Sequence, residues 1–225
     1  MSVHDGHRER LKNRFIEHGL DNFDEINALE LLLFFAVPRK DTNETAHMLL
    51  DRFGSLQGVF DAHYNELREV KGVGDNAALL ITLIPRLMRK ALIGKKEKGA
   101  FVTNSSSAGE YLVPRFMCEQ DEVLYLLCLD SAKRVICCQE MNRGVVNEVE
   151  ANIRKIVEAA LKNRASSVIL AHNHPDGIAL PSREDDYVTK RVQQSLKLVD
   201  IPLVDHIIVS GEDYVSYADS NMLMF

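Results

Sequence analysis

The sequence predicts an α/β domain in which helices pack on a mixed sheet, preceded by a small all-α domain. Up to residue 98, apolar residues recur at helical spacing, whereas beyond residue 101 short β-rich runs alternate with helical ones. The net charge also differs between these two parts of the chain. Residues 1–98 hold 15 Lys and Arg against 15 Asp and Glu, and residues 99–225 hold 12 against 18. The net charge of -6 therefore belongs to the second part, and we expect domains over 1–98 and 101–225.

The composition is that of an ordinary globular protein. Hydrophobic residues make up 46% of the 225 positions and charged residues 27%, which excludes long disorder and a disulfide-stapled miniprotein. The four cysteines, Cys118, Cys128, Cys137 and Cys138, lack the spacing of a thiolate zinc site. No apolar run approaches the ~20 residues that span a bilayer. We expect a cytoplasmic protein with reduced, structural cysteines and no membrane contact.

The first part is predicted to be a series of helices. Pro38 ends the first of them, and Asp41 or Thr42 caps the next. The expected helices are Ile26–Phe35, Asn43–Arg52, short helices beginning at Ser55 and at Asn65, and a long apolar helix from about Asp75.

Val70 to Gly74 form a tight turn before that long helix. Gly72 and Gly74 expose backbone amides beside a helix N-terminus, which is a geometry that can hold a phosphate. Residues from about 54 to 90 resemble the helix-hairpin-helix motif of DNA-binding proteins. However, Asp75 would repel a phosphate, and the domain has no net charge. A hairpin that packs or binds a partner is therefore favoured, with weak DNA contact through the Gly72–Gly74 turn as the alternative.

Two polar stretches are interpreted as a linker between the domains. They are Gly94–Gly99 and Thr103–Ser107, which lack an apolar period. In the second part, a hairpin is expected from strands at Glu122–Leu129 and Arg134–Gln139. The elements expected after it are a helix at Val149–Asn163, a strand at Ser167–Ala171, a helix at Arg183–Val199, and strands at Pro202–Val209 and Asp213–Tyr217.

The residues with the clearest chemistry follow the strand that ends near Ala171. If the chain stays extended, His172 and His174 project from the same face and their imidazoles converge. Ser182 is a good N-cap for the next helix, and Asp185 lies in that helix's first turn. Two histidines, one carboxylate and an open fourth position form the ligand set of a hydrolytic zinc site.

The segment as a whole resembles a known family. His172, His174, Pro175, Ser182 and Asp185 match the HxHP…SxxD signature of JAMM (MPN+) metalloprotease-like proteins. Together with ELREVKGVG, PSREDD and VDHIIVSGEDYVSY, the chain is similar to the bacterial RadC-like family over nearly its whole length. The resemblance implies an MPN (JAB)-type mixed-sheet sandwich, preceded by the helix-hairpin-helix region, with Zn²⁺ on His172, His174 and Asp185.

The resemblance also implies catalytic roles. A carboxylate upstream of the metal strand would serve as the base, and Glu122 is preferred over Glu140. Ser182, besides its capping role, would donate a hydrogen bond to an oxyanion. His206 is either a residue that orients a ligand or a satisfied core histidine, and Asn173 is expected to face away in a structural role.

The expected function is zinc-dependent hydrolysis of an amide or isopeptide bond in an unidentified protein or peptide substrate. Two alternatives remain open. One is a DNA-associated protein that binds or cleaves DNA, and the other is an inactive MPN scaffold that binds a partner protein.

Overall fold

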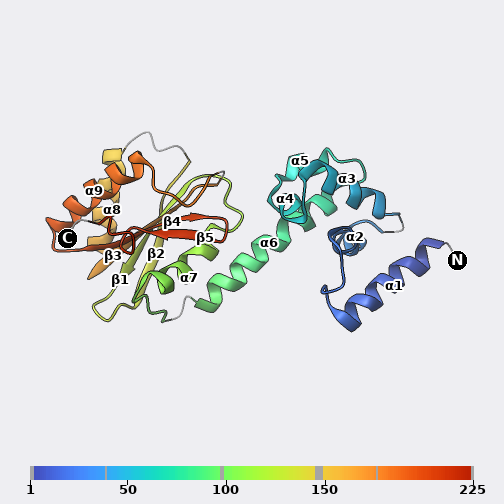
Figure 1. Ribbon diagram of the computed structural model, residues 1–225, viewed down its shortest axis with the longest axis horizontal. Coiled ribbons are helices and arrows are strands. Elements are labelled where there is room, and N and C mark those ends of the chain that lie inside the picture. The colour runs from blue at the N-terminus through green and yellow to red at the C-terminus, as the bar shows by residue number, and fades with distance from the viewer. Residues whose placement is uncertain (1–2, 39, 97–98, 145–148, 176, 224–225) are drawn as a thin grey trace. The chain divides into compact units, whose positions relative to one another are not determined.

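A computed structural model describes residues 3–38, 40–96, 99–144, 149–175 and 177–223 (Figure 1). The chain forms two compact units, Met1–Met88 and Arg89–Phe225. Within the described residues, no helix is both long and apolar enough to cross a membrane. The four cysteines form no disulfide in the described part of the chain, and burial raises the pKa of the Cys128 thiol to about 12.

The first unit is helical. Its elements are α1 (Val3–His18), α2 (Glu25–Ala36), α3 (Asn43–Phe53), α4 (Leu56–Asp61), α5 (Tyr64–Arg68) and the first part of α6 (Asp75–Lys96). Apolar side chains of α2 to α6 form its core, with Leu29, Leu33, Leu49, Leu67 and Ile81 fully buried.

The helices expected from the sequence in this unit are confirmed, with shifts of a residue or two at their ends. Ser55 caps α4 by accepting a hydrogen bond from the Gly58 amide, whereas α5 begins one residue before the expected Asn65. Helix α1 was not expected, because its sequence is mostly polar. Leu11 anchors it against Leu31 and Phe34.

The Gly72 turn is required by packing as well as by backbone conformation. Gly72 has a φ of +94°, and a Cβ at this position would lie 2.4 Å from Thr45 Oγ1. Asp75, at the start of α6, forms an ion pair with Arg68 at 2.7 Å and accepts a hydrogen bond from the Tyr64 hydroxyl. The carboxylate thus has two partners within its own unit.

The linker interpretation was wrong for two segments. Lys95 and Lys96 belong to α6, and the polar stretch Thr103–Ser107 begins helix α7 (Ser105–Phe116). Asn104 accepts a hydrogen bond from the Ser107 amide, and the Ser107 hydroxyl bonds back to the Asn104 amide, which forms a capping box. Polar residues that cap a helix have the same composition as a linker. Glu97 and Lys98, also assigned to the linker, lie outside the described residues.

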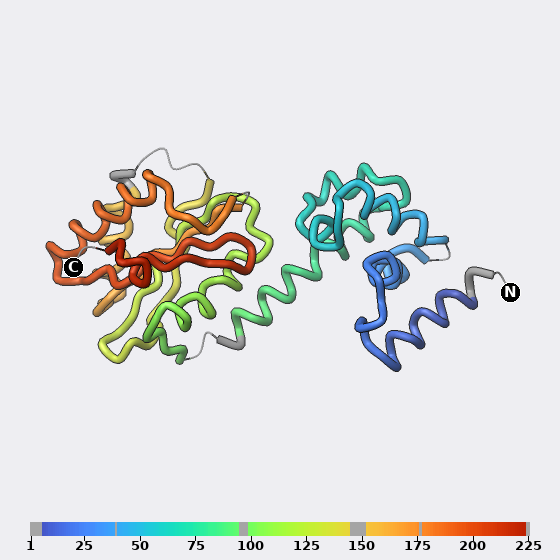
Figure 2. Tube along the Cα trace, in the orientation of Figure 1, coloured from blue at the N-terminus to red at the C-terminus, as the bar shows by residue number. Residues whose placement is uncertain are grey.

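The second unit is built on a five-stranded mixed sheet of order β2-β1-β3-β4-β5. The strands are β1 (Val123–Leu129), β2 (Val135–Arg143), β3 (Ser167–Asn173), β4 (Leu203–Ser210) and β5 (Asp213–Ser216). Only β3 and β4 pair in parallel, and the other neighbours are antiparallel. Figure 2 traces the chain from the first hairpin, in green to yellow, to the last two strands in red. The expected hairpin is confirmed, and its second strand begins one residue later than predicted and continues to Arg143 instead of Gln139.

Helices cover both faces of the sheet. Helix α7 packs on one face, where Tyr111, Leu112 and Phe116 contact residues such as Leu127 and Ile207. Helices α8 (Val149–Lys162) and α9 (Arg183–Lys197) cover the other face, and their buried residues include Ile153, Ile156, Val192 and Leu196. The fold is therefore the predicted α/β sandwich after a helical region.

Candidate metal centre

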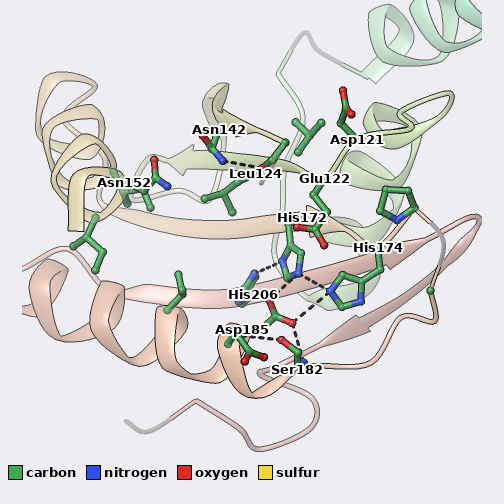
Figure 3. A pocket seen from close by; sticks show the side chains of 18 of the residues that line it. Asp121, Glu122, Leu124, Asn142, Asn152, His172, His174, Ser182, Asp185 and His206 are labelled. Carbon is green, nitrogen blue, oxygen red and sulfur yellow. Dashed lines mark hydrogen bonds and ion pairs between the residues drawn. The ribbon is translucent and has the colours of Figure 1, made fainter. Parts of the chain in front are cut away.

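The structure brings His172, His174 and Asp185 together on the face of the sheet that α8 and α9 cover (Figure 3). His172 lies near the end of β3, His174 follows that strand, and Asp185 lies in the first turn of α9. The two Nε2 atoms of the histidines are 3.0 Å apart. Asp185 Oδ1 is 3.0 Å from His172 Nε2, and Oδ2 is 3.4 Å from His174 Nε2.

These distances fit a zinc ion. Ligand atoms at about 2.05 Å from a tetrahedral zinc lie ~3.3 Å from one another, close to the three separations found here. The donor set, two imidazoles and one carboxylate, is that of sites which keep a fourth position open. No other group of three candidate ligands occurs in the part of the chain that the structure describes.

The extended backbone predicted for this segment continues past β3. The His174 amide donates to the Val209 carbonyl at 2.8 Å, which keeps the chain against β4. His174 Nδ1 lies 3.1 Å from the Ile178 carbonyl. Because a carbonyl only accepts, Nδ1 carries the proton, and Nε2 presents a lone pair to the cluster.

Asp185 is held by a capping box with Ser182. The Ser182 amide donates to Asp185 Oδ2 at 2.8 Å, and Ser182 Oγ accepts from the Asp185 amide at 3.1 Å. These two bonds orient the carboxylate toward the histidines.

His206 orients His172 through a chain of hydrogen bonds that ends at Thr189. The Thr189 hydroxyl donates to the Asp185 carbonyl at 2.6 Å, so its oxygen accepts from His206 Nδ1, also at 2.6 Å. His206 Nε2 is then bare and accepts from His172 Nδ1 at 2.9 Å. The sequence offered two interpretations of His206, and the geometry places it as the partner that leaves His172 Nε2 free for a ligand bond.

The environment of His206 keeps it neutral, as that chain of bonds requires. His206 is 2% exposed and stacks on the Tyr217 ring at 5.0 Å. Its burial lowers its pKa well below the ordinary value. Thr189 was missed by sequence reasoning. Its position four residues after Asp185 on α9 was the available signal, because such residues share a helix face.

The two candidate bases differ in their surroundings. Glu122, just before β1, lines the same cavity as the histidines, and Figure 3 shows its side chain directed toward His172. Glu140 does not line that cavity and forms an ion pair with Arg143 at 2.8 Å. Asn173 faces away, as expected. Its side chain accepts from the Val123 amide and donates to the Asp121 carbonyl, which ties β3 to the start of β1.

The cavity has a volume of about 770 Å³ and extends from the histidines to α8. Its described charged lining is acidic, formed by Asp121, Glu122, Glu184 and Asp185, and includes no Lys or Arg. The site thus combines nitrogen and carboxylate ligands with an acidic opening, an arrangement suited to a cation and to uncharged or basic organic groups.

Comparisons with known proteins agree with the family resemblance. Residues 102–222 match the family model of the RadC-like JAB domain. A UPF0758 protein of Fusobacterium nucleatum is 33% identical over 227 residues, which cover 97% of each chain. A UPF0758 protein of Pseudoalteromonas translucida is 34% identical over 96% of each chain, and one of Paraburkholderia xenovorans is 31% identical over 92% of this chain and 82% of its own. The chain therefore belongs to the RadC-like JAB domain family.

Proposed function

We propose that the protein is a zinc-dependent hydrolase of the JAMM type that cleaves an amide or isopeptide bond in a protein or peptide. One observation carries this proposal. The Nδ1 atoms of both histidines lie at hydrogen-bond distance from protein acceptors, so that two Nε2 atoms and the Asp185 carboxylate face one point. A site arranged in this way is prepared for a metal ion.

A bound zinc ion would polarise the scissile carbonyl and lower the pKa of a coordinated water. In this proposal Glu122 accepts a proton from the attacking water and delivers it to the leaving amine. Ser182 donates a hydrogen bond to the oxygen that gains negative charge. Capping uses only a lone pair of Ser182 Oγ, so the hydroxyl proton stays available and the two roles are compatible.

The charge of the cavity favours a peptide over a nucleic acid. A nuclease must accept phosphates, which basic side chains would attract, yet the charged side chains known to line this cavity are carboxylates. The Gly72 turn does not favour DNA binding either. A glycine is needed there because any Cβ would collide with Thr45, whether or not the turn binds a phosphate.

Metal analysis tests the ligand assignment. The purified protein is incubated with zinc, desalted and measured for metal content beside His174→Ala, with the exposed His47 as a control position in His47→Ala. We expect about one zinc per chain in wild type and His47→Ala, and a loss in His174→Ala. Equal zinc content in all three proteins would refute the site.

A cleavage assay tests the reaction. Zinc-loaded protein is incubated with a library of peptides and isopeptide-linked peptides, and the products are identified by mass spectrometry. Glu122→Gln should retain zinc and lose at least about 100-fold in cleavage rate, since it removes a general base. Cleavage that is equally fast in Glu122→Gln would contradict the assigned base. Zinc binding without any cleavage would support the scaffold alternative.

A further inference from the structure

The cavity continues beyond the candidate metal centre to a second polar region formed by Asn142 and Asn152 (Figure 3). In the sheet, Leu124 pairs with Asn142 on one side and with His172 on the other. Directly paired residues project to the same face, so the three side chains form a row across β2, β1 and β3. Two strand spacings of about 4.8 Å place Asn142 roughly 10 Å from His172, the length of about three extended residues.

Asn152 is the unusual member of this region. It lies on the buried face of α8, is only 7% exposed and lines the cavity. Among the residues that the structure describes, its carboxamide has no hydrogen-bond partner. Its polar atoms are not among the fully buried ones that lack a partner, and the residue lines the cavity. The carboxamide is therefore open to a ligand that enters the cavity.

Asn142 adds a second set of polar atoms. Its Nδ2 donates to the Gly144 carbonyl at a long 3.3 Å, a bond that does not use its carboxamide oxygen. The two asparagines thus offer both donors and acceptors, which match another carboxamide. Apolar side chains of Leu124, Ile153 and Ile156 line the cavity beside them and suit the methylene groups of such a ligand.

We propose that Asn142 and Asn152 form a specificity subsite that binds the side chain of a glutamine or asparagine in a peptide substrate. The bound residue lies two or three positions from the bond to be cleaved, as the 10 Å separation requires. The acidic lining disfavours a glutamate or aspartate at that position. The role in cleavage rests on the proposed function, whereas binding of the carboxamide does not.

The test measures binding without turnover. The full-length protein, freed of metal with a chelator, is titrated with acetyl-Leu-Gln-Leu-methylamide and with its Glu counterpart, and affinities are measured by calorimetry. We expect wild type to bind the Gln peptide at least tenfold more tightly than the Glu peptide. Asn152→Leu should weaken binding of the Gln peptide about tenfold, as expected when one or two hydrogen bonds are lost. Lys155→Leu, on the exposed face of α8, should change neither affinity.

A second measurement separates this role from a structural one. Leucine has nearly the shape of asparagine, so Asn152→Leu should not lower the melting temperature, because the carboxamide makes no hydrogen bond to the described residues. A structural asparagine would give a lower melting temperature on substitution. A lower melting temperature, unchanged affinity for the Gln peptide, or no binding of either peptide to wild type would overturn the subsite.

Cleavage distinguishes failure of the subsite from failure of the proposed function. If zinc-loaded protein cleaves no peptide but the binding preferences hold, the subsite stands and the hydrolase proposal fails. If library peptides are cleaved with no preference for Gln or Asn two or three residues from the cut, and Asn152→Leu does not alter this, the subsite fails and the hydrolase stands.

Discussion

Replacing Thr189 with valine should weaken zinc binding although Thr189 is not a candidate ligand. The hydroxyl accepts from His206 Nδ1 at 2.6 Å and donates to the Asp185 carbonyl at 2.6 Å. Valine preserves the shape and removes both bonds. His206 then loses the acceptor that keeps its proton on Nδ1, and a proton on Nε2 would face the Nδ1 proton of His172. Relief of that conflict moves the His172 proton to Nε2, the atom that faces the cluster.

The size of the effect follows from the bonds that are lost. One strained or unmade buried hydrogen bond costs about 1–3 kcal/mol, which corresponds to roughly a 5- to 150-fold change in an equilibrium constant. Removing an outer hydrogen-bond partner of a ligand typically weakens metal binding by about 10- to 100-fold. We therefore expect zinc affinity of Thr189→Val to fall by one to two orders of magnitude at pH 7.

The assay is competition for zinc between the protein and a chromophoric chelator. Thr82→Val is a matched control, because the Thr82 hydroxyl is also buried and donates to the carbonyl four residues earlier at 3.0 Å, with no histidine in its hydrogen bonds. An affinity of Thr189→Val within twofold of wild type, or an equal loss in Thr82→Val, would refute the assigned proton positions.

Three further predictions concern stability. Zinc at 100 times its dissociation constant should raise the free energy of unfolding by about 2.7 kcal/mol in wild type, an increase that a chelator reverses and that His174→Ala lacks. Gly72→Ala should lower the free energy of unfolding by at least about 2 kcal/mol, since its φ is +94° and its Cβ would meet Thr45, whereas Gly74→Ala should cost less than about 1 kcal/mol. If both glycine variants unfold at the same urea concentration, the strain assigned to Gly72 is wrong. Glu119 contacts Arg89 and Arg143, and although burial alone would raise its pKa, these two bonds outweigh burial and lower it. Its charged form therefore stabilises the fold above the unfolded-state pKa of about 4.5, and this contribution is lost as the pH falls through the lower folded-state value. Glu119→Gln should cost about 1–2 kcal/mol at pH 7 and progressively less below pH 4.5, and a cost independent of pH would contradict this interpretation.

The candidate ligands were predictable because their placement is decided locally. An extended HxH segment brings two imidazoles to one face, and a serine N-cap fixes the first turn in which Asp185 lies. The hydrogen-bond partner of His172 was harder to predict from the sequence. His206 reaches it only through the parallel pairing of β3 with β4, and the sequence does not state which strands pair or in which register.

Two groups of residues could not be placed correctly from the sequence. The polar residues before α7 favour a linker as much as a helix cap, because both are rich in Ser, Thr and Asn. Asn152 was overlooked within a helix whose apolar period was correctly recognised. A polar residue at a buried position of such a helix is a signal in its own right, but whether it has a partner is decided only by the tertiary structure.

The strand-helix-strand crossover formed by β3, α9 and β4 contains all three candidate ligands together with Thr189 and His206. Such supersecondary units often open as cooperative segments below the free energy of global unfolding. A bound ion would join the end of β3 to the first turn of α9, so two elements that are separate in the sequence would open together or not at all. Amide hydrogen exchange should accordingly slow on zinc binding in β3, the first turn of α9 and β4.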